Sequence, residues 1–187
     1  MCGDSCLRGN PYRRPSSGFT LVELMISIVL LGILATVGSS MIVDSLTTTR
    51  MVNATNASAT QARYALERLE REIREIKYTK VGASGNYSIS TMIANKLVFI
   101  RTISGADVTV TIDNLTNPTL LTLSYSSPQV TSTLSTNSNI ALAYYDIGGN
   151  ATVSTSAIRF VAITLTVTDP TSGQSISQRS RVALRNA

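Results

Sequence analysis

The sequence predicts an α+β protein in which a long amino-terminal helix packs on an antiparallel β-sheet. An apolar run from Phe19 to Val43 is long enough for several helical turns, and a later stripe of apolar residues has helical spacing. The second half of the chain instead alternates apolar with polar residues, which is the period of a strand with one buried face. The helical stripe consists of Leu66, Leu69, Ile73 and Ile76, and the clearest strand pattern of Val108, Val110 and Ile112.

The apolar run is predicted to cross a membrane. Its 25 residues would span about 37 Å as an α-helix, which exceeds the hydrocarbon core of about 30 Å. Arg13 and Arg14 precede it, so the positive-inside rule places the leader in the cytoplasm and the bulk of the chain across the membrane. Small residues recur within the run at three- and four-residue steps, which suits close helix packing and equally suits a lipid-facing helix. These are Gly32, Ala35, Gly38 and Ser39.

Glu23 is the one charge in this run. A carboxylate at the centre of a membrane helix costs roughly 2.5 to 3.5 kcal/mol, and somewhat less off-centre, so a compensating partner such as a free amine is expected. A secretory signal carries its cleavage site after the apolar region, whereas here the small residues Ser16, Ser17 and Gly18 precede it. Cleavage after Gly18 would remove a basic leader and create a new amino terminus at Phe19, close to Glu23.

Gly18, Phe19 and Glu23 resemble the class III signal of type IV prepilins and pseudopilins. In that family a prepilin peptidase cuts after the glycine and methylates the new terminal residue. The resemblance therefore implies N-methylation of Phe19. It also implies that Glu23 of an incoming subunit meets the terminal amine of a neighbour in the filament. The alternative is a signal anchor with an incidental acid.

The resemblance divides the chain into four parts. They are a removed leader (1–18), the transmembrane half of the helix (19–43), its extracytoplasmic amphipathic half (44–80) and a β-rich globular domain (81–187). Within the second half of the helix, Asp44 to Gln61 is rich in Ser, Thr and Asn, so a break or frayed turn is an alternative there.

The charged residues after Ala62 are predicted to form a solvated helix face. Glu67 with Arg71 and Glu70 with Arg74 have the favourable i,i+4 order, worth roughly 0.2 to 0.5 kcal/mol each. Glutamates interleaved with the basic residues cancel most of their field, so a DNA-binding strip is not expected. The basic residues are Arg63, Arg68, Arg71, Arg74, Lys77 and Lys80, and the acids Glu67, Glu70, Glu72 and Glu75. The net charge of +5 falls to +3 without the leader, so no anionic partner is required.

The second half of the chain is expected to be mostly strands. Further strands are predicted at Lys96 to Arg101, at Leu121, Leu123 and Tyr125, at Ile140 to Asp146, and in a hairpin of Ile158 to Thr168 with Ile176 to Leu184. The turn between the last two, Asp169 to Gly173, has proline and glycine where a tight turn needs them. Loops are predicted at Val81 to Tyr87 and at Ser126 to Asn139.

Catalytic, metal and cofactor sites are not expected. The chain has no histidine, and its two cysteines, Cys2 and Cys6, both lie in the leader. The commonest general base and a thiol nucleophile are therefore missing from the mature chain, as is a zinc-type ligand set. The acids at strand ends or turns are better explained as local caps than as calcium ligands, because calcium needs several convergent oxygens. Asp146 to Asn150 is the best calcium candidate among these segments. The other such acids are Asp107, Asp113 and Asp169, and five glycosylation sequons, at Asn53, Asn56, Asn86, Asn114 and Asn150, stay unassigned.

The resemblance implies a non-catalytic minor pilin or pseudopilin, incorporated into the initiation or tip complex of a type IV pilus or a type II secretion pseudopilus. Residues 63–74 and 181–186 resemble PilW-type minor pilins and the J-type pseudopilin of type II secretion. The implied partners are prepilin peptidase, other subunits and the inner-membrane assembly platform. One alternative is a major shaft pilin, which the absent disulfide and the poorly helical Asp44 to Gln61 disfavour. Another is a membrane-tethered adhesin that does not polymerise.

Overall fold

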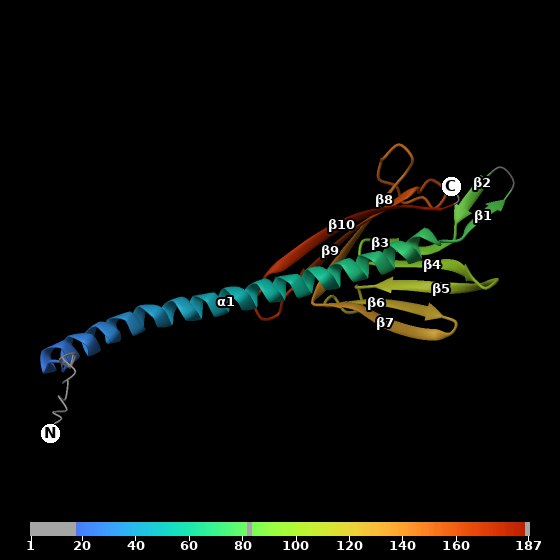
Figure 1. Ribbon diagram of the computed structural model, residues 1–187. Helices are drawn as coiled ribbons and strands as arrows, with labels where there is room; N and C mark the ends of the chain where they lie inside the picture. The colour runs from blue at the N-terminus through green and yellow to red at the C-terminus, as the bar shows by residue number, and fades with distance from the viewer. Residues whose placement is uncertain (1–17, 82–83, 186–187) are drawn as a thin grey trace, which may run out of the picture. The chain divides into compact units, whose positions relative to one another are not determined.

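The computed structural model describes residues 18–81 and 84–185 and confirms the α+β class (Figure 1). A long helix, α1, precedes a series of antiparallel strands, and the chain divides into two compact units after Thr48. The elements are α1 (Leu21–Arg74), β1 (Tyr78–Val81), β2 (Ser84–Tyr87), β3 (Ile89–Ile93), β4 (Lys96–Ile103), β5 (Ala106–Asp113), β6 (Leu120–Ser126), β7 (Gln129–Thr136), β8 (Ser138–Tyr145), β9 (Phe160–Thr168) and β10 (Ser175–Ala183).

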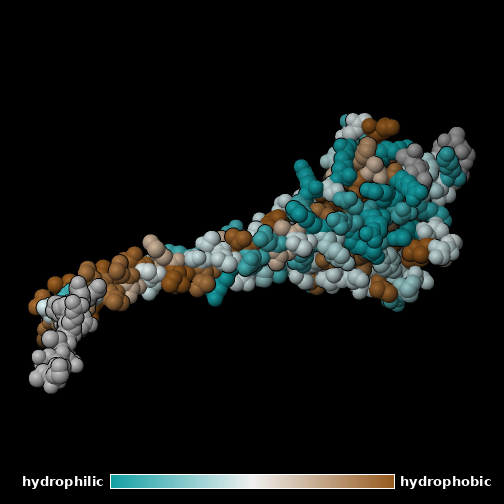
Figure 2. Space-filling model, in the orientation of Figure 1, coloured by the Kyte–Doolittle hydropathy of each residue, from teal (hydrophilic) through white to brown (hydrophobic). Residues whose placement is uncertain are grey.

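The first unit contains the apolar part of α1, whose hydrophobic surface is coloured brown in Figure 2. By length and composition α1 is the one helix in the described residues able to cross a membrane. Its hydroxyl groups donate to carbonyl oxygens of the preceding turn: Ser27 to Glu23, Thr36 to Ile33, Ser39 to Ala35 and Ser40 to Val37. These polar side chains are thus satisfied by the helix itself.

The helix continues through Asp44 to Gln61, so the alternative of a break or frayed turn there is wrong. The same hydroxyl bonding explains how this segment stays helical. Thr47 and Thr48 both donate to the carbonyl oxygen of Asp44, at 2.9 and 2.8 Å, and Thr60 donates to that of Asn56. Helix propensity is a weak preference, and here these side chains bond within the helix instead of competing with it.

α1 ends at Arg74, before the expected boundary at Lys80. The amide of Lys77 donates to Ile100 of β4, and its carbonyl accepts from Ser88, so both backbone groups of Lys77 bond outside the helix. The predicted loop at Val81 to Tyr87 is also wrong, because β1 and β2 form a hairpin. Gly85 is required by close packing, since a Cβ there would lie 2.2 Å from the hydroxyl of Tyr78.

Two sheets follow in the second unit. The five-stranded sheet has the order β3-β4-β5-β6-β7 and the three-stranded sheet the order β10-β9-β8, with antiparallel neighbours throughout. The strand predictions for β4, β5, β6, β8 and the β9–β10 hairpin are confirmed. The predicted loop at Ser126 to Asn139 is wrong, because it contains β7 and the start of β8. β7 is an edge strand whose first five residues are all exposed, so it has no apolar alternation to detect.

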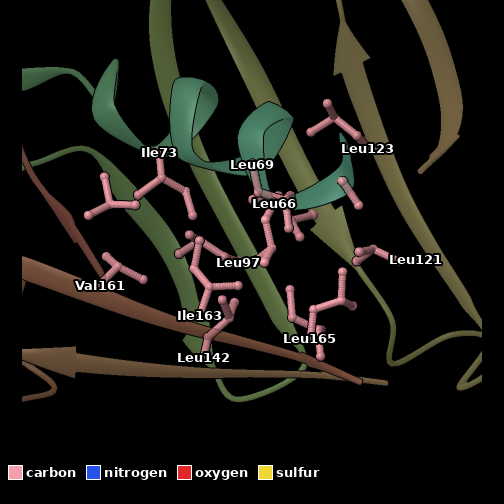
Figure 3. Close-up of a cluster of buried hydrophobic side chains, with 14 of the residues drawn as sticks. Leu66, Leu69, Ile73, Leu97, Leu121, Leu123, Leu142, Val161, Ile163 and Leu165 are labelled. Atoms are coloured by element: carbon pink, nitrogen blue, oxygen red, sulfur yellow. The ribbon is translucent and has the colours of Figure 1, made fainter. Parts of the chain in front are cut away.

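The apolar stripe of α1 packs between the two sheets. Figure 3 shows Leu66, Leu69 and Ile73 beside core residues of both sheets. The five-stranded sheet contributes Leu97, Leu121 and Leu123, and the three-stranded sheet Leu142, Val161, Ile163 and Leu165. Burial of each such side chain contributes about 1.5 to 3 kcal/mol, so this shared core holds the helix and both sheets together.

The solvated charged face that the sequence suggested forms only in part, because Glu67, Arg71 and Arg74 are exposed while Glu72 is buried. Glu72 is 1% exposed, and its carboxylate pairs with Arg68 at 3.3 Å and with Arg101 of β4. Glu70 accepts from Ser180 of β10, and Glu75 pairs with Arg185. The expected pairs Glu67–Arg71 and Glu70–Arg74 do not occur among the ion pairs of the described residues. Glu70 instead faces Ser180 on the β-rich part.

We expect Glu72→Ala to lower the free energy of unfolding by about 3 to 5 kcal/mol, because it leaves the half-buried guanidinium of Arg101 unpaired. Chemical unfolding of the chain in non-ionic detergent, followed by the β-sheet circular dichroism signal, measures the change. Glu67→Ala removes an exposed glutamate of the same helix and should change stability by less than about 0.5 kcal/mol. Equal effects of the two substitutions would contradict a stabilising role for the buried Glu72–Arg101 ion pair.

Candidate processing and assembly site

Thr20 caps the amino terminus of α1. Its hydroxyl oxygen accepts a hydrogen bond from the amide of Glu23 at 3.2 Å, and its carbonyl accepts the first helical bond, from Leu24, at 3.1 Å. Thr20 and Glu23 therefore have the spacing of a capping box. Thr20 was not among the predicted site residues, although a threonine three residues before a glutamate at the head of an apolar run is a sequence signal of such a cap.

Glu23 lies exposed in the first turn of α1. A negative charge at this end of a helix interacts favourably with the helix dipole, by about 0.3 to 1 kcal/mol at the surface. No residue of the described ranges donates a hydrogen bond to its carboxylate or pairs with it. Within 18–81 and 84–185 the only compensation for this charge is thus the helix end itself.

Gly18 and Phe19 precede the helix and have no regular secondary structure. Phe19 is 76% exposed, and no atom lies within 4 Å of where a Cβ of Gly18 would stand. The Gly18–Phe19 peptide bond is therefore open on this chain, outside the hydrogen-bonded helix. The other leader residues, including Cys2 and Cys6, lie outside the described residues.

The acids considered for calcium serve as local caps or ion-pair partners. Asp113 accepts from the amides of Leu115 and Thr116, at 2.8 and 3.0 Å, and pairs with Lys96 at 2.9 Å. Asp169 accepts from Thr171 and Ser172, Asp146 from Asn150, and Asp107 from Lys77. The described residues contain no cluster of three side chains able to hold a metal ion. Each of these carboxylates thus has donors in its own turn or on an adjoining strand, which for Asp107 is Thr102 of β4 in addition to Lys77.

Asn114 has a structural role that makes its sequon inaccessible. It is 1% exposed, and its amide group donates to the carbonyl oxygens of Leu120 and Ser138 at 3.0 and 3.1 Å. Its side-chain oxygen accepts from the amide of Ile140 at 3.0 Å. The side chain therefore joins β6 to β8, and with them the two sheets.

One comparison with known proteins finds a match at the amino-terminal end of the chain. Residues 13–39 match the prokaryotic N-terminal methylation motif, which is the class III signal of type IV prepilins. No curated protein and no solved structure matches the chain significantly. With its long apolar helix on antiparallel sheets, the chain has the pilin-like architecture. The motif supports a type IV pilin-like precursor of the kind that prepilin peptidase processes, and the apolar helix fits inner-membrane anchoring.

The ion pair and hydrogen bonds of Asp113 predict acid sensitivity. Lys96 and the donors of Leu115 and Thr116 hold the pKa of the Asp113 carboxyl well below its ordinary value, against the opposing effect of partial burial. A pKa that is lower in the folded state stabilises the protein above the unfolded value, near 4, and this stabilisation is lost as the pH falls below it. Asp113→Asn should therefore lower stability at pH 7 more than at pH 3.

Urea unfolding at both pH values measures this difference. Asp44→Asn, at an exposed aspartate of α1, is the matched control and should change stability little at either pH. An Asp113→Asn effect that is the same at pH 7 and pH 3 would count against the ion pair as its cause.

Proposed function

We propose that this chain is a minor pilin or pseudopilin, cut after Gly18 and methylated at Phe19. Residues 19–43 hold it in the inner membrane, and packing of this helix incorporates it into a type IV pilus or a type II secretion pseudopilus. The observation that carries the proposal is the single charge, Glu23, in an exposed apolar stretch beside an open Gly18–Phe19 bond.

The proposed assembly contact joins Glu23 of one subunit to the terminal amine of Phe19 in a neighbour. The carboxylate has no partner in the described part of its own chain, and a membrane supplies no water to solvate it. Cleavage creates a cation at Phe19, so processing and assembly are linked. A subunit that keeps its leader lacks the amine that the next Glu23 would meet.

The orientation follows from the charges that flank the apolar helix. Arg13 and Arg14 hold the leader on the cytoplasmic side, where prepilin peptidase acts on it, and the β-rich unit lies across the membrane. The assembly platform in the inner membrane and other pilin subunits are the partners of this pathway. The part played by the chain is structural and not enzymatic.

The minor role is supported by the cysteines and by two short resemblances. With Cys2 and Cys6 removed, no cysteine is left to form the disulfide common in major pilins. Residues 63–74 and 181–186 resemble PilW-type and J-type proteins. The poorly helical segment at Asp44 to Gln61 no longer argues against a major pilin, because that segment is helical. Neighbouring genes for a retraction motor or for a secretin would decide between a pilus and a secretion system.

Cleavage is tested by substituting Gly18. In cells that carry a prepilin peptidase, mass spectrometry should find a mature chain that begins with methylated Phe19, and Gly18→Val should leave the leader attached. Gly32→Ala is the control, because a Cβ at Gly32 meets no atom within 4 Å, and this variant should be cut normally. A wild-type chain that retains Met1 to Gly18 would defeat the proposal.

The assembly contact is tested by Glu23→Ala, which removes the proposed partner of the neighbour's amine. The variant should be processed normally but be lost from sheared filaments or pseudopili, with its β-rich unit still resistant to protease. Glu67→Ala, at an exposed glutamate in the second unit, should assemble like the wild type. Unchanged surface display without incorporation of either wild type or variant would favour the tethered adhesin.

A further inference from the structure

The outward face of the three-stranded sheet has a distinct composition. Along β9 the residues that alternate with the buried Val161, Ile163 and Leu165 point away from the core. Strand register places these outward residues in rows across the sheet. One row contains Ala141, Thr164 and Arg179, and the next contains Ala143, Ala162 and Arg181. The face is therefore made of small residues on two strands and long basic residues on the third.

These rows line a hollow of about 430 Å³, which we call the basic groove. Ala141, Ala143 and Ala162 form its floor, and the longer side chains of Tyr145, Arg179 and Arg181 border it. These three alanines leave room above the sheet that larger side chains would fill. All of the residues that line the groove belong to the second unit.

The two arginines are oriented by neutral partners. The guanidinium carbon of Arg181 lies 4.3 Å from the ring centroid of Phe160 and 5.4 Å from that of Tyr145. The Nε of Arg179 donates to the hydroxyl of Thr164 at 3.2 Å. Stacking on aromatic rings restrains a guanidinium while its N–H groups remain able to donate in the ring plane.

No acid neutralises the basic groove from within the described chain. The outward rows contain no aspartate or glutamate, and neither arginine forms an ion pair with a residue in 18–81 or 84–185. The nearest acids in sequence, Asp146 and Asp169, accept hydrogen bonds within their own turns. Glu70 of α1 accepts from Ser180, which lies between the two arginines but on the inward side of β10. The groove therefore presents two restrained guanidinium groups that form no ion pair with the described residues.

We propose that the basic groove binds an extended acidic segment of a partner protein. Alternate residues of an extended chain project to the same side, about 7 Å apart. Arg179 and Arg181 are themselves alternate residues of β10, so two carboxylates with one residue between them match their spacing. Each guanidinium can donate to a carboxylate through paired N–H groups, while the small side chains of the segment fill the alanine floor.

Charge and size favour this occupant over a nucleic acid. A nucleic acid neutralises many phosphates along a broad basic surface, whereas this groove has two arginines above a short apolar floor. The proposal goes beyond the filament role, because binding at the sheet face requires neither cleavage at Gly18 nor Glu23. The exposed side of the β-rich unit would then select its partner separately from the filament contacts, through charge complementarity with an acidic segment.

The test uses the full chain in non-ionic detergent and a fluorescent threonine-rich peptide carrying two glutamates separated by one threonine. Fluorescence anisotropy should show saturable binding that weakens as salt is raised. The same peptide with glutamines in place of the glutamates should not bind. An oligothymidylate of similar length tests the nucleic-acid occupant.

Substitutions in the groove locate the binding. Arg179→Gln combined with Arg181→Gln should lower the association constant by about tenfold or more. Arg181→Lys, which keeps the charge but loses the planar fork, should have a smaller effect. Arg71→Gln removes an exposed arginine of α1 and should bind like the wild type. Circular dichroism checks that each variant is folded.

Three outcomes would overturn the proposal. They are the absence of peptide binding to the wild type, equal binding by the double variant, and tighter binding of oligothymidylate than of the acidic peptide. If the double variant does not fold, Arg181→Lys replaces it, because lysine keeps the charge and the aliphatic stem and loses only the paired N–H geometry. Binding by Arg181→Lys that equals binding by the wild type would then overturn the proposal.

Discussion

The packing of the apolar stripe of α1 between the two sheets is the interaction on which the β-rich unit depends. Each sheet has one apolar face, and the stripe with Leu69 at its centre contacts both, so removing the helix would expose both faces to water. The glutamates beside the stripe fix the position and rotation of the helix on the sheets. Since Glu70, Glu72 and Glu75 each meet a partner on the β-rich part, the helix cannot slide or rotate without breaking charged contacts.

The sequence predicted those parts of the fold where burial has a regular period. The stripe of α1 and the strands around Val110 and Ile163 follow such periods, and all were found. β7 was missed because an edge strand can be held by backbone bonds to β6 while its side chains stay in water. Glu72 was misplaced because charge was taken to mean exposure. Its position three residues after Leu69 and four before Ile76 puts it within the stripe, which the spacing alone already indicates.

The two candidate sites differ in how far a sequence can predict them. Gly18, Phe19 and Glu23 are neighbours along the chain, so their spacing is visible before any folding, as is the cap formed by Thr20. The basic groove instead requires Ala143, Ala162 and Arg181 to lie in one row. These residues come from three strands, and a shift of one residue in any pairing would turn its side chains to the other face. Only the structure brings them together.

The hydroxyl groups of α1 have a consequence for movement between environments. Serine and threonine side chains along its apolar half donate to carbonyls of their own helix, as do Thr47 and Thr48 further on. The helix therefore carries its hydrogen-bond partners with it, and transfer from lipid into a bundle of helices exchanges none of them. The hydroxyl groups of this segment thus keep the same hydrogen bonds in either environment. Glu23 is the one charged side chain between Phe19 and Val43, so its free energy depends most strongly on what surrounds it.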